Sequence, residues 1–355
     1  MQTESTKTDT RLSQPARVRY RGPIWTLLIL APVIGEVLSG STRLSILFVL
    51  IPEMMVWGGG ALLCREMVRR WRAGGISLLL LGLALSVAEE FVIQQTSLAP
   101  LPFPGVNAAF GRYLGVNWIY FLFMLGYESV WVVLVPVQVT ELLFPARREQ
   151  PWLRKRGLIA TCIVFLIGCR IAWYGWTQQA LKRMNVAPYH PPALTIASGL
   201  VAIAILICFA YLLRDHGHPG RVVNRSAANP WLIGIVAFVF STGWWALMVL
   251  IFTPKPKVTA ATALLLGLIW AMVAFATIWF GSSGQGWSDM HRWAASAAAT
   301  LSCMLPGYLT LVGWSRPDLI FKICVNVAAV VALLLLARKV RRRVADARAQ
   351  QAAQV

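Results

Sequence analysis

Charged residues are scarce in this sequence: Asp, Glu, Lys and Arg make up only 13% of its 355 residues. A soluble domain carries about 25% charged residues, so this chain has too few to solvate the surface of a water-soluble protein. Apolar residues make up 57%, and the mean hydropathy is +0.63. The composition therefore predicts an all-α integral membrane protein, because apolar helices satisfy their own backbone hydrogen bonds in lipid.

Acidic residues are the scarcest charged group, with 14 Asp and Glu against 33 Lys and Arg, for a net charge of +19. In a soluble protein such an excess would indicate nucleic-acid binding. Here the cations lie between apolar runs, where membrane topology explains them. We therefore predict a lipid bilayer, and no nucleic acid, as the partner.

Histidine and cysteine are also few, with four and six residues. The histidines all lie in expected connecting loops, and no two cysteines form a C-x-x-C pair. His216-Gly-His218 resembles a metal pair only superficially, and a solvated basic loop is the better interpretation. The sequence thus predicts no zinc site and no disulfide framework, and it specifies no cofactor.

Apolar runs of membrane-spanning length recur along the chain. We expect about ten transmembrane helices in a polytopic bundle, with the Pro- and Gly-rich segment 98–116 irregular and partly tucked over it. The ten runs are residues 23–39, 45–64, 75–97, 117–144, 157–178, 192–213, 231–253, 259–280, 293–314 and 318–337.

The distribution of Lys and Arg predicts the orientation. With a cytoplasmic N-terminus, the inside segments carry 24 of these cations and the outside loops carry 7. This asymmetry favours both termini inside. Residues 1–22 are polar and aperiodic, so we expect a disordered cytoplasmic tail, and residues 338–355 form a basic cytoplasmic tail.

Dense basic clusters lie in the predicted cytoplasmic segments, and they are suited to anionic lipid headgroups. Membrane orientation alone also explains them. The clusters are Arg65, Arg69, Arg70 and Arg72; Arg147, Arg148, Arg154, Lys155 and Arg156; and the run Arg338–Arg343.

Ionisable residues inside the apolar runs are the candidate functional residues. Counting about 1.5 Å per helical residue places five carboxylates and one guanidinium between the bilayer centre and its outer third. They are Glu36, Glu53, Glu89, Glu90, Glu128 and Arg170. Buried charges are costly, so intramembrane ionisable groups are functional candidates by default. Glu141 lies nearer the cytoplasmic end, where we expect it to reach Arg147 or Arg148.

The third run carries a polar stripe at four-residue spacing: Gly82, Ser86, Glu90 and Gln94. Glu89 points about 100° away from that stripe. All five of these glutamates fall in residues 23–156, whereas residues 157–337 contain almost no charge in their cores. We therefore expect helices 1–4 to carry the site and helices 5–10 to be scaffold.

Glu89-Glu90-Phe-Val-Ile-Gln94 resembles the E-E-x-x-x-R motif of the CPBP intramembrane metalloproteases. In that family the glutamate pair and histidines of later helices build a metal or water-activating site. Here Gln94 replaces the arginine, and the segment Phe123–Tyr127 ends in tyrosine where the F-x-x-x-H motif has histidine. The resemblance implies Glu89, Glu90 and Glu128 as catalytic candidates of a degenerate enzyme.

A second resemblance is to an uncharacterised family of bacterial multi-pass membrane proteins. It covers about residues 31–153 and implies a bacterial inner-membrane protein without an established activity. The matching stretches are Gly35-Glu36, Ser39-Gly-Ser-Thr42, Gly59-Gly-Ala-Leu-Leu63, Arg65-Glu66, Glu89-Glu90, Gly111–Trp118, Glu141-Leu-Leu-Phe-Pro145 and Pro151-Trp-Leu153.

Three function hypotheses remain open from the sequence. The first is binding or transport linked to protons or a cation. The second is a CPBP-like metal-dependent hydrolase, and the third is a non-catalytic assembly or immunity factor. For the first, the candidate binding residues are Glu36, Glu53, Ser86, Glu90, Gln94, Glu128 and Arg170, with Arg170 as a counter-ion.

Overall fold

The structure is a computed structural model that describes residues 21–99, 109–183, 185, 190–216, 223–253, 255–309 and 314–352. Nearly all of the tail predicted at residues 1–22 lies outside the described residues. So do residues 100–108 of the segment 98–116, residues 217–222 with His218, and the last three residues of the chain.

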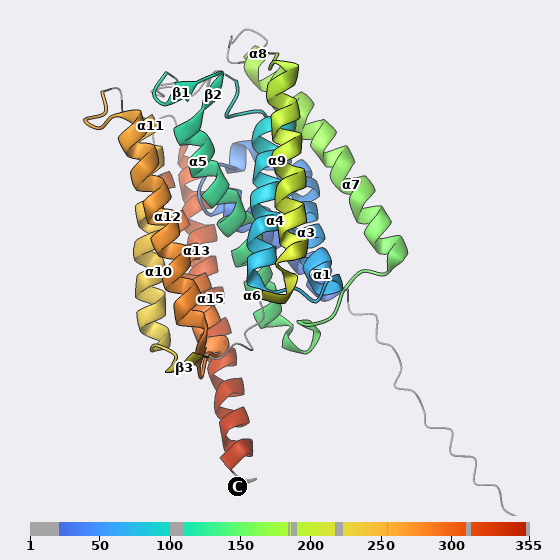
Figure 1. Cartoon of the computed structure of the whole chain (residues 1–355), viewed down its shortest axis with the longest axis vertical. Helices are drawn as coiled ribbons and strands as arrows, with labels where there is room; N and C mark the ends of the chain where they lie inside the picture. The colour runs from blue at the N-terminus through green and yellow to red at the C-terminus, as the bar shows by residue number, and fades with distance from the viewer. Residues whose placement is uncertain are drawn as a thin grey trace, which may run out of the picture.

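The described chain is a helical bundle, as predicted (Figure 1). It contains eight helices long and apolar enough to cross a membrane, together with two shorter ones at Gly22–Val37 and Asp289–Met304. Each of the ten predicted runs therefore contains helix within the described residues. In chain order the spans are α1 (Gly22–Pro32) with η1 (Val33–Val37); η2 (Leu44–Val49), α2 (Leu50–Glu53), η3 (Met54–Gly58) and α3 (Gly59–Arg70); α4 (Gly75–Ala88) with η4 (Glu89–Ile93); α5 (Trp118–Tyr127), η5 (Glu128–Leu134) and α6 (Val135–Leu143); α7 (Lys155–Tyr174) with η7 (Gly175–Ala180) and α8 (Leu181–Arg183); α9 (Ala193–Leu212); α10 (Pro230–Trp244) with α11 (Ala246–Ile251); α12 (Ala260–Ser282); α13 (Asp289–Met304) with α14 (Pro306–Leu309); and α15 (Arg316–Ala352).

Short elements connect the spans. Strands β1 (Arg112–Tyr113) and β2 (Val116–Asn117) form an antiparallel hairpin. Strands β3 (Val223–Ser226) and β4 (Gly284–Gln285) pair in parallel at the opposite end of the bundle (Figure 1). We call these ends the hairpin end and the basic end. The start of α1 and the end of α15 lie at the basic end (Figure 1). Arg65 and Arg69 of α3 bond Glu141 near the end of α6, and Arg65 also bonds the Arg148 carbonyl.

The glutamate-bearing spans are central, and other spans form the rim. In their most apolar windows, 67% of the span Gly75–Ile93 and 61% of Trp118–Leu143 is buried, against 6% of Lys155–Ala180 and 11% of Ala260–Ser282. Large apolar side chains on α7, α9, α12 and α15 are exposed, as expected for lipid-facing surfaces. The candidate acids therefore face the protein interior, not lipid.

Tryptophan side chains join the two halves of the bundle. Trp131 donates from Nε1 to the Ala299 carbonyl at 2.7 Å, and Trp244 donates to the Phe123 carbonyl at 2.9 Å. Both rings are buried in a core shared by α5, η5, α11 and α13. A buried indole N–H needs an acceptor, so these bonds fix which helices face each other. Trp131 and Trp244, two of the chain's 16 tryptophans, therefore connect helices inside the bundle and do not anchor it at the membrane interface.

Small residues permit close helix contacts around the site. A Cβ atom at Gly58 would lie 2.3 Å from the Leu28 carbonyl oxygen, and one at Gly82 would lie 3.2 Å from the Ser129 Cα. Only glycine allows the first of these approaches without moving a backbone. These contacts bring η3 against α1, and α4 against η5.

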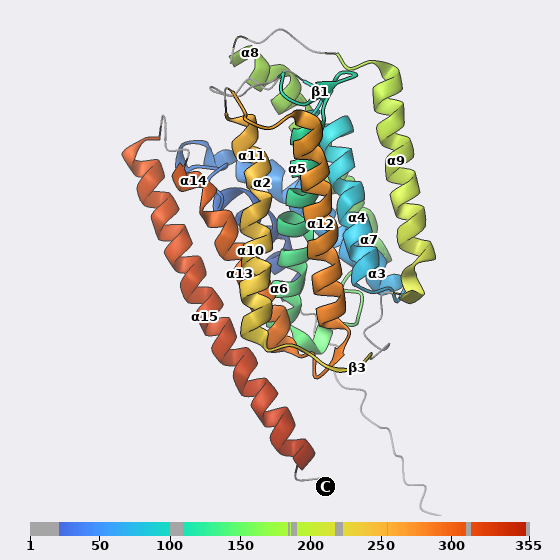
Figure 2. The ribbon, with the colours of Figure 1, turned by 60° about the vertical axis from the view of Figure 1, so that its left-hand side comes forward.

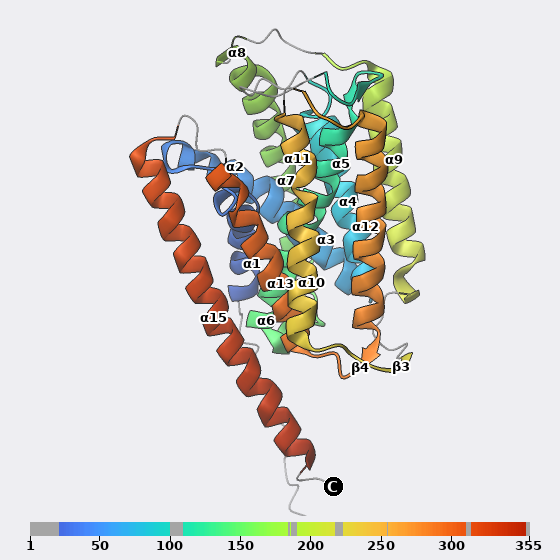
Figure 3. The same cartoon turned by 90° about the vertical axis from the view of Figure 1, so that its left-hand side faces the viewer.

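Helix α15 slants across one side of the bundle and extends beyond it at the basic end (Figures 2 and 3). It runs without interruption from Arg316 to Ala352. The basic segment that we expect from residue 338 onward is thus a continuation of the last helix up to Ala352.

Candidate functional site in the membrane-spanning bundle

Each of the five predicted intramembrane glutamates lies in or directly beside a π-helical segment. Glu36 lies in η1, Glu53 directly precedes η3, Glu89 and Glu90 open η4, and Glu128 opens η5. A π-turn contains an extra residue, is rare, and is often found at functional sites. A π-turn therefore accompanies each of the five glutamates that were predicted from their depth in the membrane.

The π-turn at η4 changes the predicted polar stripe. The backbone N–H groups of Gln94 and Gln95 both donate to the Glu89 carbonyl, at 2.9 and 3.1 Å, because the helix widens there. Gln94 consequently leaves the four-residue register, and within the described ranges its half-buried side chain forms no hydrogen bond. Ser86 keeps its place and donates from Oγ to the Met124 carbonyl at 3.0 Å, which ties α4 to α5.

Glu90 is held by hydroxyl groups from the loop that follows η4. Thr96 donates to both carboxyl oxygens at 2.8 Å, and Ser97 donates to Oε2 at 2.5 Å. The loop is fixed in turn because the Asn117 N–H donates to the Ser97 carbonyl at 2.8 Å, and Arg112 donates to the carbonyls beyond it. The β1–β2 hairpin therefore caps Glu90 from the hairpin end. Sequence reasoning did not find Thr96 or Ser97, because their positions depend on the π-turn.

Glu36 and Glu53 form the second part of the carboxylate layer. Thr42 donates from its hydroxyl to Glu53 Oε1, and the Tyr127 hydroxyl lies 3.3 Å from Glu36 Oε1 while it donates to the Gly35 carbonyl. The two carboxyl groups are near enough to interact electrostatically. Tyr127 precedes Glu128 in the chain and thus links this pair to η5.

Glu89 and Glu128 are buried without adequate partners. Glu89 is 1% exposed, and in the described part of the chain neither of its carboxyl oxygens has a hydrogen-bond partner. Glu128 is 2% exposed, and its Oε2 atom is likewise unpaired among the described residues. Glu128 lies within electrostatic range of Glu89, Glu90 and Glu36. An ionised carboxylate that is buried without a partner costs on the order of several kcal/mol, because the protein interior, like lipid, has a low dielectric constant.

The predicted counter-ion Arg170 lies elsewhere. Its side chain is exposed on α7, and its guanidinium stacks over the Trp173 ring at 4.4 Å. No lysine or arginine among the described residues forms an ion pair with any of the five glutamates. Arg170 therefore does not neutralise this layer, and no side-chain cation in the described ranges offsets the cost of burying the acids.

The buried lysine of α15 contributes to the site region and was not singled out from the sequence. Lys322 is 1% exposed and donates from Nζ to the carbonyls of Leu38 and Ser39, at 2.9 and 3.1 Å. These carbonyls end the first span, where the helix dipole favours a cation. Asp318, one turn earlier, accepts from the Ser45 N–H at 2.9 Å. The second half of the chain thus holds the 38–45 segment that lies between Glu36 and Glu53.

A separate buried network lies at the basic end, and it corrects the expected partner of Glu141. Arg65 Nε donates to Glu141 Oε1 at 3.1 Å, and Arg69 Nη2 donates to both Glu141 oxygens at 2.7 and 2.8 Å. Glu66 accepts from the backbone N–H groups of Trp152 and Leu153. The prediction that Glu141 reaches Arg147 or Arg148 is wrong. Instead, the Arg147 and Arg148 carbonyls accept from Arg65.

The donor set at the carboxylate layer does not favour a metal ion. Within the described ranges, no three His, Cys, Asp or Glu side chains are grouped as metal ligands. Hydroxyl groups donate to Glu53 and Glu90, whereas Glu89 has no hydrogen-bond partner in the part of the chain that the structure describes. Such an arrangement can take up and pass protons, since a neutral carboxylic acid both donates and accepts hydrogen bonds.

Fold and composition together define the class: this is a polytopic helical membrane protein. The chain belongs to a family described as an uncharacterized membrane protein family, whose model matches residues 26–350. The match confirms the resemblance to an uncharacterised membrane protein family, extends it beyond residues 31–153, and provides no support for the CPBP resemblance. No curated protein and no solved structure matches the chain.

Proposed function

We propose that this protein binds and passes protons through its carboxylate layer, as part of proton-linked binding or transport in a bacterial inner membrane. The observation that carries the proposal is the carboxyl group of Glu89, which is buried and has no hydrogen-bond or ion-pair partner among the described residues. Burial and the neighbouring Glu90 both disfavour the charged form, so a proton is the simplest compensation.

The surroundings support a path between the acids. Among the described residues, both oxygens of Glu89 and Oε2 of Glu128 have no hydrogen-bond partner. Glu90 is held by Thr96 and Ser97, and Tyr127 lies beside Glu36. Hydroxyl and carboxyl groups that lie next to one another in space can exchange a proton through small side-chain rotations, because each can both donate and accept a hydrogen bond. The absence of a three-ligand cluster among the described residues favours protons over a metal cation as the bound species.

The test is proton flux in vesicles that contain the full-length protein. An imposed pH gradient should discharge faster with the wild-type protein than in empty vesicles, and Glu89→Gln should abolish the difference. Glu149→Gln removes a glutamate whose side chain is 75% exposed, and it should leave the flux unchanged. Flux that needs added Na⁺ or K⁺ would make the protein cation-linked. Equal rates in wild-type and Glu89→Gln vesicles would overturn the proposal.

A further inference from the structure

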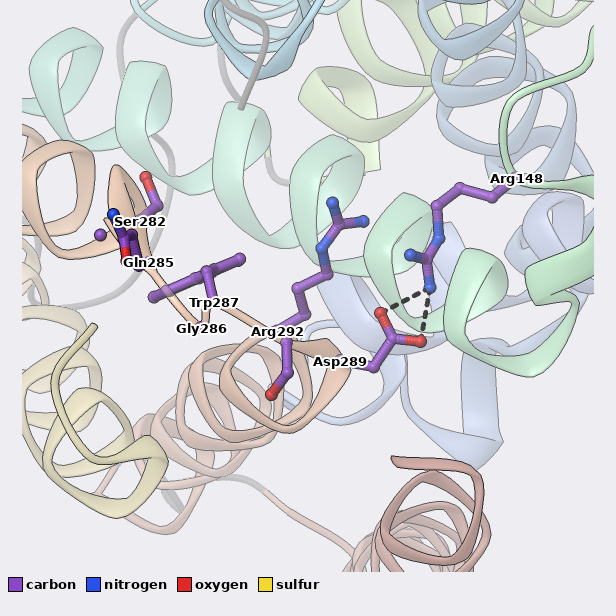
Figure 4. Close-up of a pocket in the computed structure, with 9 residues that line it drawn as sticks. Arg148, Ser282, Gln285, Gly286, Trp287, Asp289 and Arg292 are labelled. Atoms are coloured by element: carbon purple, nitrogen blue, oxygen red, sulfur yellow. Dashed lines mark hydrogen bonds and ion pairs between the residues drawn. The ribbon is translucent and has the colours of Figure 1, made fainter. Parts of the chain in front are cut away.

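A pocket of about 600 Å³ opens at the basic end, beside β4, and none of the five glutamates lines it (Figure 3). Figure 4 shows its lining residues. Pockets of roughly 300–1,000 Å³ are typical of small-ligand sites. This one is formed where the loop between α12 and α13 meets the segment after α6. The residues that line it include Arg148, Gly286, Trp287, Asp289 and Arg292.

Two arginines extend into this pocket, and their charges are not equally compensated. Arg148 donates from Nη2 to both oxygens of Asp289, at 2.8 and 2.7 Å. Arg292 is half-buried, and no ion pair or hydrogen bond of its guanidinium is found in the described part of the chain. Figure 4 shows both guanidinium groups directed toward the same space, with dashed lines only between Arg148 and Asp289.

The electrostatic balance of this pocket favours an anion. Arg292 lies within electrostatic range of two arginines, Arg148 and Arg69, and of two carboxylates, Asp289 and Glu141. Asp289 already accepts from Arg148, and Glu141 accepts from Arg65 and Arg69, so neither carboxylate bonds Arg292. A guanidinium has five N–H donors, and those of Arg292 have no protein acceptor among the described residues, so they are available to a ligand that enters the pocket. The Nε atom of Arg148 is also buried with no partner among the described residues. One bound anion would accept from both side chains and relieve their mutual repulsion.

The loop beside the arginines leaves room for such a ligand. Gly286 has φ +85°, and a Cβ atom there would meet nothing within 4 Å. The Trp287 ring stacks on the His291 ring with centroids 4.7 Å apart, which fixes that wall of the pocket. The loop thus leaves open space at Gly286, and the Trp287 ring is held by its contact with His291.

We propose that this pocket binds a phosphate group, with Arg292 and Arg148 as its ligands. The guanidinium fork matches phosphate geometry, and the pocket opens at the end of the bundle, where headgroup phosphates of a bilayer lie. A lipid headgroup and a free phosphate compound present the same chemistry to these residues. The site is independent of the carboxylate layer.

The experiment compares wild-type protein, Arg292→Gln and the control Arg156→Gln, an exposed arginine outside the pocket. Thermal unfolding in detergent is followed against inorganic phosphate, with chloride at equal ionic strength. Native mass spectrometry measures retention of phosphatidic acid against phosphatidylcholine. We expect about tenfold weaker binding in Arg292→Gln and wild-type binding in Arg156→Gln, as for loss of a charge-assisted bidentate contact.

The two arms distinguish the source of the phosphate. Retention of phosphatidic acid that depends on Arg292 assigns the site to a lipid headgroup. A response to inorganic phosphate alone that depends on Arg292 assigns it to a soluble compound. Equal binding by wild-type protein and Arg292→Gln, or an equal loss in Arg156→Gln, overturns the proposal. If Arg292→Gln does not fold, Arg292→Lys keeps the charge without the fork and should weaken binding several-fold.

Discussion

Two groups of buried glutamates in this molecule differ in how their charge is compensated. Glu66 and Glu141 at the basic end are 0% exposed, and Glu89 and Glu90 in the carboxylate layer are 1% exposed. Glu141 has two arginines and Glu66 has backbone N–H groups as well as Arg65. Glu89 has nothing comparable in the described part of the chain. The two groups are therefore equally buried. The difference is that Glu141 is part of a structural ion pair, whereas Glu89 lacks a partner among the described residues and is for that reason the functional candidate.

The compensated network also explains three of the stretches that carry the family resemblance. Arg65-Glu66, Glu141–Pro145 and Pro151-Trp-Leu153 meet in space, with the Arg65 guanidinium 3.5 Å from the centroid of the Trp152 ring. Together they close the basic end by holding the loop between α6 and α7 against α3. We assign these residues a structural role, because every carboxylate among them is paired.

The largest expected effect is at Glu141. Glu141→Gln leaves Arg65 and Arg69 facing a neutral group in a buried site, and we expect a loss of about 3 kcal/mol in the free energy of unfolding. Unfolding of the purified protein in detergent measures it. Glu149→Gln, in which the lost glutamate pairs with Arg69 in solvent, should change stability by less than about 0.5 kcal/mol. A loss below about 1 kcal/mol in Glu141→Gln would mean that the network is not structural.

The next effect concerns the cap over Glu90. Thr96→Val keeps the shape of the side chain and removes both hydrogen bonds to Glu90, so we expect a loss of about 1–2 kcal/mol. Thr277→Val removes only a hydroxyl that bonds its own helix on an exposed face, and it should cost less than about 0.5 kcal/mol. Equal losses in the two variants would show that the hydroxyl of Thr96 does not stabilise the carboxyl group.

A smaller effect is expected at the contact between the two halves. Trp131→Phe removes the N–H donor to the Ala299 carbonyl while keeping an aromatic ring in the core, and we expect a loss of about 1 kcal/mol. Trp25→Phe changes a ring that is 55% exposed and serves as the control. A Trp131→Phe variant as stable as the control would mean that ring packing alone joins η5 to α13.

The sequence predicted the architecture of the bundle because length and hydropathy determine which segments span a membrane. All ten helices are present, and depth counting selected five glutamates that fall in the central spans. Side-chain register was predicted less well. The π-turn at Glu89 shifts Gln94 off the stripe and brings Thr96 and Ser97 to Glu90, and no four-residue pattern anticipates an extra residue in a turn.

Partners distant in the sequence were also beyond pattern reasoning. Glu141 was expected to pair with neighbours six or seven residues away, but α3 packs beside α6 and supplies Arg65 and Arg69. Lys322 was visible as a cation within an apolar run, yet its acceptors are carbonyls nearly 300 residues earlier. Carbonyl acceptors carry no sequence signal, since every residue has one.

The smallest expected effect on stability, at Glu89, is the most informative one. Glu89→Gln replaces a carboxyl group without a hydrogen-bond partner among the described residues by a neutral group of the same shape. We expect stability to change by less than about 0.5 kcal/mol, in contrast to the loss in Glu141→Gln, because no favourable contact is removed. The same unfolding measurement compares both variants. A loss in Glu89→Gln as large as that in Glu141→Gln would mean that Glu89 is held as a structural ion. Unchanged stability would show that the bundle is intact, and loss of proton flux in vesicles would show that a proton acceptor is missing. The two results together would separate function from folding at a single residue.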